Sequence, residues 1–297
     1  MSRATVIIPT YNRPEAIKQT LDSIEEMESS IEYSVMIVDD SDEDRTKKIC
    51  EDHAVDLEYV RPEISENLPH ARNVGIGKAD GEIVAFVDDD VRFYDGWVDE
   101  VVEAFENNEE AGAVGGPALE FEDGEPKKTI LNSTENQNVV TEKGFITDKS
   151  TRWVPEDTVE TDTLRGANMA FQKSVLEQVG GFDEEYIGNS FREDTDICVR
   201  LKRRGYRIIY NPEAKIEHLY LNEGGTRDKS KHFWYSLGYN QRKFVEKNFP
   251  SYRLTHFINL AFFWSYEPYS LLKIILSSLK DKKLGRLAYI KGFIEGE

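Results

Sequence analysis

Three consecutive carboxylates, Asp88 to Asp90, follow an apolar run over residues 83–87. Such a run is typical of a buried strand, so the triplet is expected where the chain leaves a sheet. Like charges this close repel one another unless a cation joins them, and Mg²⁺ or Mn²⁺ accepts carboxylate oxygens together with substrate phosphates. Asp88 and Asp90 share one side of an extended backbone. The triplet therefore predicts a metal-diphosphate site, although an acidic turn in solvent is the plainer interpretation of the triplet alone.

Strands and helices alternate four times in the amino-terminal third. The pattern predicts strands over 4–9, 34–38, 57–60 and 83–87, and helices from Pro14, over 43–53, over 69–78 and over 96–107. This spacing is typical of βαβ units, which form a mostly parallel sheet covered by helices on both faces. Ligands bind at the carboxyl ends of such strands. Three of these ends carry polar clusters, at residues 11–13, 39–40 and 88–90.

The middle of the chain is less regular. Residues 120–160 have low hydrophobicity and little periodicity, which predicts a long mobile loop or an insertion. A helix is expected over 173–179, ended by Gly180 and Gly181. Another opens at residues 193–196 with several carboxylates, which the helix dipole stabilises whether or not they have a catalytic role.

The formal net charge of −19 limits the partners of the chain. Negative charge of this size disfavours nucleic acid, so no nucleic-acid partner is expected. Cys50 and Cys198 lie far apart without the spacing of a metal site, which fits a reducing compartment. The first residues lack the pattern of a signal peptide. We therefore expect a cytoplasmic location, with a peripheral position on the cytoplasmic face of the membrane left open.

The carboxyl-terminal tail is rich in aromatic and aliphatic residues, but Glu267 and Pro268 interrupt its most apolar run. A membrane-spanning helix needs about 20 mostly apolar residues, so the sequence does not support a span. Apolar residues at helical spacing over 272–279 are followed by basic residues up to Arg286. We expect residues 257–291 to lie on an anionic membrane surface, or to pack on the protein's own core or on the partner in a homodimer.

Seven motifs in this order resemble those of the inverting family-2 glycosyltransferases, whose fold is called GT-A. They lie at residues 6–12, 37–41, 71–76, 86–90, 166–170, 180–183 and 192–196. The resemblance covers about residues 3–220 and implies an α/β protein of GT-A type with a helical, aromatic-rich carboxyl-terminal tail. It divides the chain into a glycosyltransferase domain over 1–225 and a tail over 226–297. Within the domain, about 1–110 would bind the nucleotide sugar and about 111–225 the acceptor.

The resemblance implies residues for the donor nucleotide. Pro9, Tyr11 and Arg13 would line the nucleotide pocket, with the Tyr11 ring against the base. Asp39 would accept a hydrogen bond from a base N–H, as uracil offers, and Arg72 would contact the sugar nucleotide near its phosphates.

The resemblance also implies a metal site. Asp90 would be the more direct ligand of Mg²⁺ or Mn²⁺, with Asp88 nearer the ribose or a bound water. His218 falls where some family members have another metal or diphosphate contact, although a single histidine is as often an ordinary structural residue.

For the acceptor side, the resemblance implies that Asp194 is the catalytic base and that Glu193 helps to hold the acceptor. Gly166, Ala167 and Asn168 would form the wall that faces the donor sugar and the acceptor.

Together these features predict a metal-dependent hexosyltransferase. It would transfer a sugar from a nucleotide-diphosphate sugar, with UDP favoured, to an acceptor hydroxyl or a lipid-linked acceptor with inversion, in glycan, glycolipid or protein-glycosylation assembly. A non-catalytic binding module for nucleotide sugars or membranes is an alternative. A nucleotidyltransferase is another, but it would need a glycine-rich phosphate loop after the first strand, and residues 10–14 contain no glycine.

Overall fold

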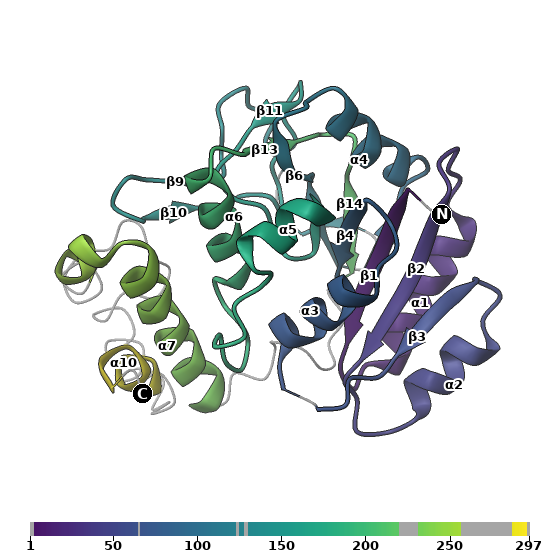
Figure 1. Cartoon of the computed structure of the whole chain (residues 1–297), viewed down its shortest axis with the longest axis horizontal. Helices are drawn as coiled ribbons and strands as arrows, with labels where there is room; N and C mark the ends of the chain where they lie inside the picture. Colours follow the sequence, from purple (N-terminus) through teal and green to yellow (C-terminus); the bar gives the residue numbers. More distant parts are fainter. Residues whose placement is uncertain are drawn as a thin grey trace.

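The computed structural model of the chain describes residues 3–64, 66–122, 125–127, 130–219, 231–256 and 287–295. A sheet of eight strands runs through the middle of this part (Figure 1). In spatial order the strands are β11 (Val159–Glu160), β13 (Arg207–Tyr210), β6 (Ala111–Gly115), β12 (Asn168–Gln172), β4 (Ile83–Val87), β1 (Ala4–Thr10), β2 (Tyr33–Asp39) and β3 (Leu57–Val60).

The sheet is mostly parallel, as predicted. β1 pairs in parallel with β2 and β4, β2 pairs in parallel with β3, and β13 pairs in parallel with β6. β12 lies antiparallel between β4 and β6, and β11 is antiparallel to β13. The four strands expected in the amino-terminal third are all present at almost the predicted residues, because each is a short apolar run between turn residues.

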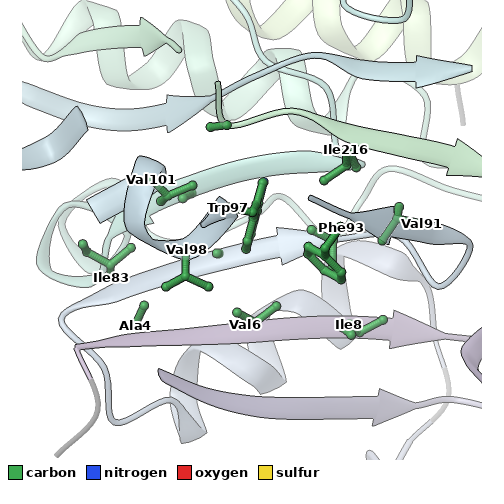
Figure 2. Packing of buried hydrophobic residues seen from close by; sticks show 14 of the residues in the cluster. Ala4, Val6, Ile8, Ile83, Val91, Phe93, Trp97, Val98, Val101 and Ile216 are labelled. Atoms are coloured by element: carbon green, nitrogen blue, oxygen red, sulfur yellow. The ribbon is translucent and has the colours of Figure 1, made fainter. Parts of the chain in front are cut away.

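Apolar side chains cover both faces of this sheet, since alternate residues of a strand point to opposite sides. Val6 and Ile8 of β1 pack under helices α1 (Pro14–Glu26), α2 (Arg45–Asp52) and α4 (Trp97–Glu106). Figure 2 shows Val6 and Ile8 on the same side of the sheet as Trp97 and Val98 of α4. Ile7 belongs to the opposite cluster, with helices α3 (Leu68–Lys78), α5 (Lys173–Val179) and α6 (Glu193–Arg203). The prediction of helices on both faces is confirmed.

A second sheet of four strands lies beside the acidic triplet. Its order is β5 (Val91–Phe93), β14 (Ile216–Leu219), β7 (Ala118–Glu122) and β8 (Glu125–Pro126). β14 is antiparallel to β5 and parallel to β7. Because β5 begins directly after Asp90, this pairing brings a strand from far along the sequence to the end of β4.

Of the two expectations for residues 120–160, a long mobile loop or an insertion, the described part does not fit the first. Their described part contains the two-stranded sheet of β9 (Val139–Val140) and β10 (Ile146–Thr147), together with β11 at the edge of the large sheet. Trp153 is completely buried and stacks on Tyr210 with ring centroids 4.8 Å apart. A few isolated apolar residues therefore anchor this polar segment, and low average hydrophobicity does not reveal such anchors.

The tail is helical where it is described. Helix α7 (Lys231–Asn248), the short 3₁₀ helix η2 (Pro250–Tyr252) and helix α10 (Leu287–Glu295) lie at one end of the molecule, with α10 against α7 (Figure 1). Trp234 and Leu237 of α7 pack with Phe293 of α10. Most of the expected membrane surface over 257–291 lies outside the described residues. Among the helices that are described, none is long and apolar enough to cross a membrane.

Asp183 fastens α7 to the body of the protein. Its carboxylate lies 2.6 Å from Lys247 Nζ and 3.3 Å from Lys243 Nζ. Partial burial opposes ionisation of this group, but the lysines outweigh burial and lower the pKa of Asp183. A depressed pKa stabilises the folded state above the ordinary carboxyl pKa, and this stabilisation is lost as the pH falls through the folded-state pKa.

We expect Asp183→Asn to lower the free energy of unfolding by about 1 kcal/mol at neutral pH, the usual size for a charged hydrogen bond that keeps some solvent contact. Denaturant unfolding at a series of pH values should show the difference from wild type shrinking towards zero in acid. Glu51→Gln removes an exposed ion pair with Lys47 and serves as the control, with little change expected at any pH. A pH-independent effect of Asp183→Asn would contradict the ionic role.

Candidate active site

Asp89, the middle carboxylate of the triplet, holds the acidic loop to the sheet and to α1. Thr10 Oγ1 donates to its Oδ2 at 2.7 Å, and Arg13 pairs with its other oxygen. Thr20 Oγ1 donates to its backbone carbonyl at 2.8 Å. Burial raises the pKa of Asp89 to about 7. Asp89 therefore has a structural role, because its contacts fix the position of the acidic loop.

Asp88 and Asp90 converge with His218. The histidine lies on β14, opposite Val91 of β5, and its Nε2 is 3.4 Å from Asp88 Oδ2 and 3.3 Å from Asp90 Oδ1. Ligand atoms of these three side chains all lie within 4.8 Å of one another. The structure thus brings together the two aspartates that the spacing predicts and a histidine about 130 residues away in the sequence.

The charges at this cluster are strongly coupled. Burial favours the neutral forms, but the mutual contacts outweigh it and raise the pKa of His218 to about 9. In the same way, contacts with His218 and Arg13 overcome burial and lower the pKa of Asp90 to about 2. Arg13 Nη2 lies 2.6 Å from Asp90 Oδ2. Two cationic side chains therefore balance the acidic cluster.

Two carboxylates and one imidazole fit a divalent cation. Carboxylate oxygens suit Mg²⁺ and Mn²⁺, and imidazole is a better ligand for the transition metal. A histidine ligand must be neutral, so ion binding would displace the proton that the aspartates hold on His218. Within the described ranges, one further group of three side chains has possible ligand atoms within 4.8 Å of one another. It consists of Glu66, His70 and Glu184 and lies nearer the protein surface.

The residues expected around the nucleotide lie at the neighbouring strand ends. Pro9 is buried in β1, whereas Tyr11 is 53% exposed and its hydroxyl donates to Asp42 at 3.2 Å. Asp39 is completely buried at the end of β2, where it accepts hydrogen bonds from Tyr59 Oη at 2.7 Å and from the backbone N–H of Ser41 at 3.0 Å. Contact of these residues with a base stays a prediction.

Arg72 is buried between the acidic triplet and the start of α6. Its side chain is 1% exposed and lies between the rings of Phe86 and Phe182, with Cζ 5.8 and 5.3 Å from the ring centroids. Its guanidinium forms an ion pair with Glu193 and lies 3.9 Å from Asp88 Oδ1. Arg72, which is expected near the phosphates, therefore connects the cluster of Asp88, Asp90 and His218 to the start of α6.

Gly166 continues this connection to Asp194. Its carbonyl accepts from Arg72 Nη2 at 3.1 Å, and its N–H donates to Asp194 Oδ2 at 3.1 Å. A Cβ at this position would lie 2.8 Å from Arg72 Nη2, so a larger residue would have to displace the buried guanidinium. Asp194 remains partly exposed, and its role as the catalytic base stays a prediction.

The other two residues of the expected wall turn their side chains into the protein. Ala167 packs in the core. The Asn168 amide donates to the carbonyls of Pro117 and Ala214 at 3.2 and 2.7 Å and accepts from Trp97 Nε1 at 3.2 Å. Of this wall, the structure places only Gly166 in contact with Arg72 and Asp194, and the role of the wall in substrate binding stays a prediction.

Glu193 is too deeply buried to contact an acceptor from its present position. It is 4% exposed, and burial raises its pKa to about 7 in spite of its ion pair with Arg72. The sequence did not reveal this ion pair, since Arg72 and Glu193 lie on different helices. It also missed Thr10 and Thr20, although Thr10 ends a strand next to a polar cluster, which is a usable signal.

Comparison with known proteins identifies the family. Residues 5–180 match the family described as glycosyl transferase family 2, and residues 155–222 match the N-terminal domain of galactosyltransferase. The chain is 26% identical over 228 residues to the glucosyl-dolichyl phosphate glucuronosyltransferase of Haloferax volcanii, covering 73% of this chain and 69% of that protein. It is 24% identical over 221 residues to the probable glycosyltransferase YdaM of Bacillus subtilis. This match covers 72% of this chain and 50% of that protein.

Solved structures agree on the fold. A mannosyltransferase from Pyrobaculum calidifontis, solved with GDP-Man and Mn²⁺, superposes with a TM-score of 0.60 at 18% identity, covering 100% of this chain and 88% of that one. GalNAc-T7, solved with UDP, GalNAc and Mn²⁺, gives a TM-score of 0.69 at 14% identity, covering 98% of this chain and 56% of that one. At these identities the likeness establishes the GT-A fold that the motifs predicted.

The family match spans more than half of the sequence, and it includes Tyr11, Asp39 and the acidic triplet. On this ground, the chain belongs to glycosyl transferase family 2 and is a glycosyltransferase.

Proposed function

We propose that this glycosyltransferase moves a sugar from a nucleotide-diphosphate sugar, with inversion at the anomeric carbon, to an acceptor hydroxyl or a lipid-linked acceptor. The observation that carries the proposal is the convergence of Asp88, Asp90 and His218 at the carboxyl end of β4. Arg72 links this cluster to the helix of Asp194, so donor-side and acceptor-side groups share one site.

Departure of a nucleoside diphosphate builds negative charge on the leaving group. A divalent cation, Mg²⁺ or Mn²⁺, held by Asp88, Asp90 and His218 would neutralise that charge when bound. His218 and Arg13 keep Asp90 ionised, as a metal ligand must be, whereas His218 would have to release its proton on binding the cation. Similar solved structures contain UDP or GDP-mannose with Mn²⁺, which supports a nucleotide-diphosphate donor.

Attack by an acceptor hydroxyl requires removal of its proton, and we assign this role to Asp194. The hydrogen bond from Gly166 N–H fixes one carboxylate oxygen of Asp194 at 3.1 Å. A base on the acceptor side, opposite the departing diphosphate, corresponds to displacement in one step. Displacement in one step inverts the anomeric carbon, so a base in that position is part of the proposal of inversion.

A lipid-linked acceptor has two lines of support. The Haloferax volcanii relative is named for a dolichyl phosphate substrate. The sequence of the tail over 257–291 combines apolar and basic residues, which suits an anionic membrane surface. Such a surface would bring the active site close to a lipid-linked substrate.

The first prediction tests the donor nucleotide and the cation together. In thermal unfolding with UDP, GDP, dTDP or CMP, each with and without Mn²⁺, we expect UDP with Mn²⁺ to raise the melting temperature by on the order of 5 °C at saturating concentration. Asp90→Asn should abolish the Mn²⁺-dependent part of the shift, because it removes one carboxylate of the cluster.

Glu184→Gln is the matched control, since it removes a carboxylate of the more exposed Glu66, His70 and Glu184 group. It should leave the shift intact. A shift with GDP or dTDP would redirect the donor and keep the reaction class. Absence of any shift would contradict the proposed metal-diphosphate site.

The second prediction concerns the base. Asp194→Asn should lower turnover by at least about 100-fold, because general base catalysis typically contributes that much. Binding of the nucleotide, measured by the same thermal shift, should survive. Turnover close to wild type would sink the base assignment, and it would point instead to an acceptor that is already anionic, such as a lipid phosphate.

The third prediction concerns the membrane. The protein should float with vesicles that contain anionic lipid and remain in the soluble fraction with neutral vesicles. Replacing Lys280, Lys282 and Lys283 with glutamine should weaken flotation, because these residues supply much of the positive charge of the tail. Unchanged recovery in the soluble fraction with anionic vesicles would favour packing of the tail on protein.

A further inference from the structure

The loop that leads into α6 has an unusual backbone. Gly188, Ser190 and Arg192 have φ angles of 57°, 51° and 79°. Only the first is glycine, and a bulky residue such as arginine is rarely left-handed unless surrounding contacts hold it. Arg192 directly precedes Glu193 and Asp194, so its conformation sets the direction in which the candidate base is presented.

Helix α7 supplies contacts that hold Arg192. Arg192 Nε donates to Gln241 Oε1 at 2.9 Å, and Gln241 is 1% exposed. Arg192 Cζ also lies 6.0 Å from the centroid of the buried Phe244 ring on the same face of α7. A buried charged group with these neighbours has little freedom to turn.

The same helix also contacts the residues on both sides of this turn. Asn248 Nδ2 donates to the buried Asp196 carboxylate at 2.7 Å, two residues after Asp194. Before the turn, the Asn240 side chain donates to the carbonyl of Ile187 at 2.8 Å and accepts from its N–H at 3.0 Å. α7 therefore holds the start of α6 from both directions.

We propose that Gln241 is a positioning residue for Asp194, acting through the left-handed backbone of Arg192. The proposal rests on the proposed function in taking Asp194 as the base. Arg192 supplies the carbonyl that accepts from the N–H of Asp196, the first turn of α6, at 2.8 Å. If Arg192 turned to an ordinary φ, this turn would shift, and Asp194 would lose its hydrogen bond from the N–H of Gly166.

The test compares two replacements of Gln241. Gln241→Leu removes the acceptor for Arg192 and should lower kcat at least 10-fold, with the KM of the donor within twofold of wild type. Amide exchange over residues 190–197 should rise at least 10-fold. Gln241→Glu keeps the acceptor and should restore both properties.

Arg242→Ala is the matched control. Arg242 lies next to Gln241 on α7, and its Nε donates to Glu246 Oε1 of the same helix at 2.8 Å. Its loss should lower the melting temperature and leave kcat and exchange over 190–197 within twofold of wild type. Amide exchange needs no substrate, so it tests the positioning step even if the proposed reaction fails.

Two replacements of Arg192 separate its backbone from its side chain. Glycine adopts a positive φ without cost, whereas alanine does not. Arg192→Gly should therefore keep kcat within about threefold of wild type, and Arg192→Ala should lower it at least 10-fold. Equal losses in these two variants, or an unchanged kcat or exchange rate in Gln241→Leu, would overturn the proposal.

Discussion

The negative charge at the end of β4 is the constraint on which the site depends. Three carboxylates in sequence cannot be partly buried together unless cations balance them. The protein supplies Arg13 from the start of α1, His218 from β14 and, more distantly, Arg72 from α3. Each of these comes from a different element, so the fold must bring all three elements to one strand end.

This balance explains why the three aspartates have separate roles. Asp89 faces inward, where hydrogen bonds from Thr10 and Thr20 tie the loop to the fold. Asp90 shares its two oxygens between Arg13 and His218. Asp88 is the most exposed of the three, with 35% of its side chain accessible.

The start of α6 is connected to the same charge. Arg72 reaches Asp88 on one side and Glu193 on the other, and its contact with the Gly166 carbonyl fixes the peptide that meets Asp194. The start of α6 is in turn packed against α7. Residues far beyond the glycosyltransferase motifs thus contribute to the geometry of the site.

The sequence by itself determined the four strands and four helices expected in the amino-terminal third and the helix expected over 173–179. Apolar runs such as 83–87 and glycine pairs such as Gly180 and Gly181 are local signals, and strands and helices follow them almost to the residue. Local spacing also identified Asp88 and Asp90 as a unit. These features depend on neighbouring residues, so a single sequence is enough to predict them.

Only the tertiary structure decided which distant residues meet. His218 reaches the aspartates because β14 pairs with β5, and Glu193 reaches Arg72 because α6 and α3 cover the same face of the sheet. Trp153 shows the same limit, since one buried ring orders a segment whose composition predicts a loop. Such contacts depend on strand order and helix packing, and neither leaves a periodic signal in the sequence.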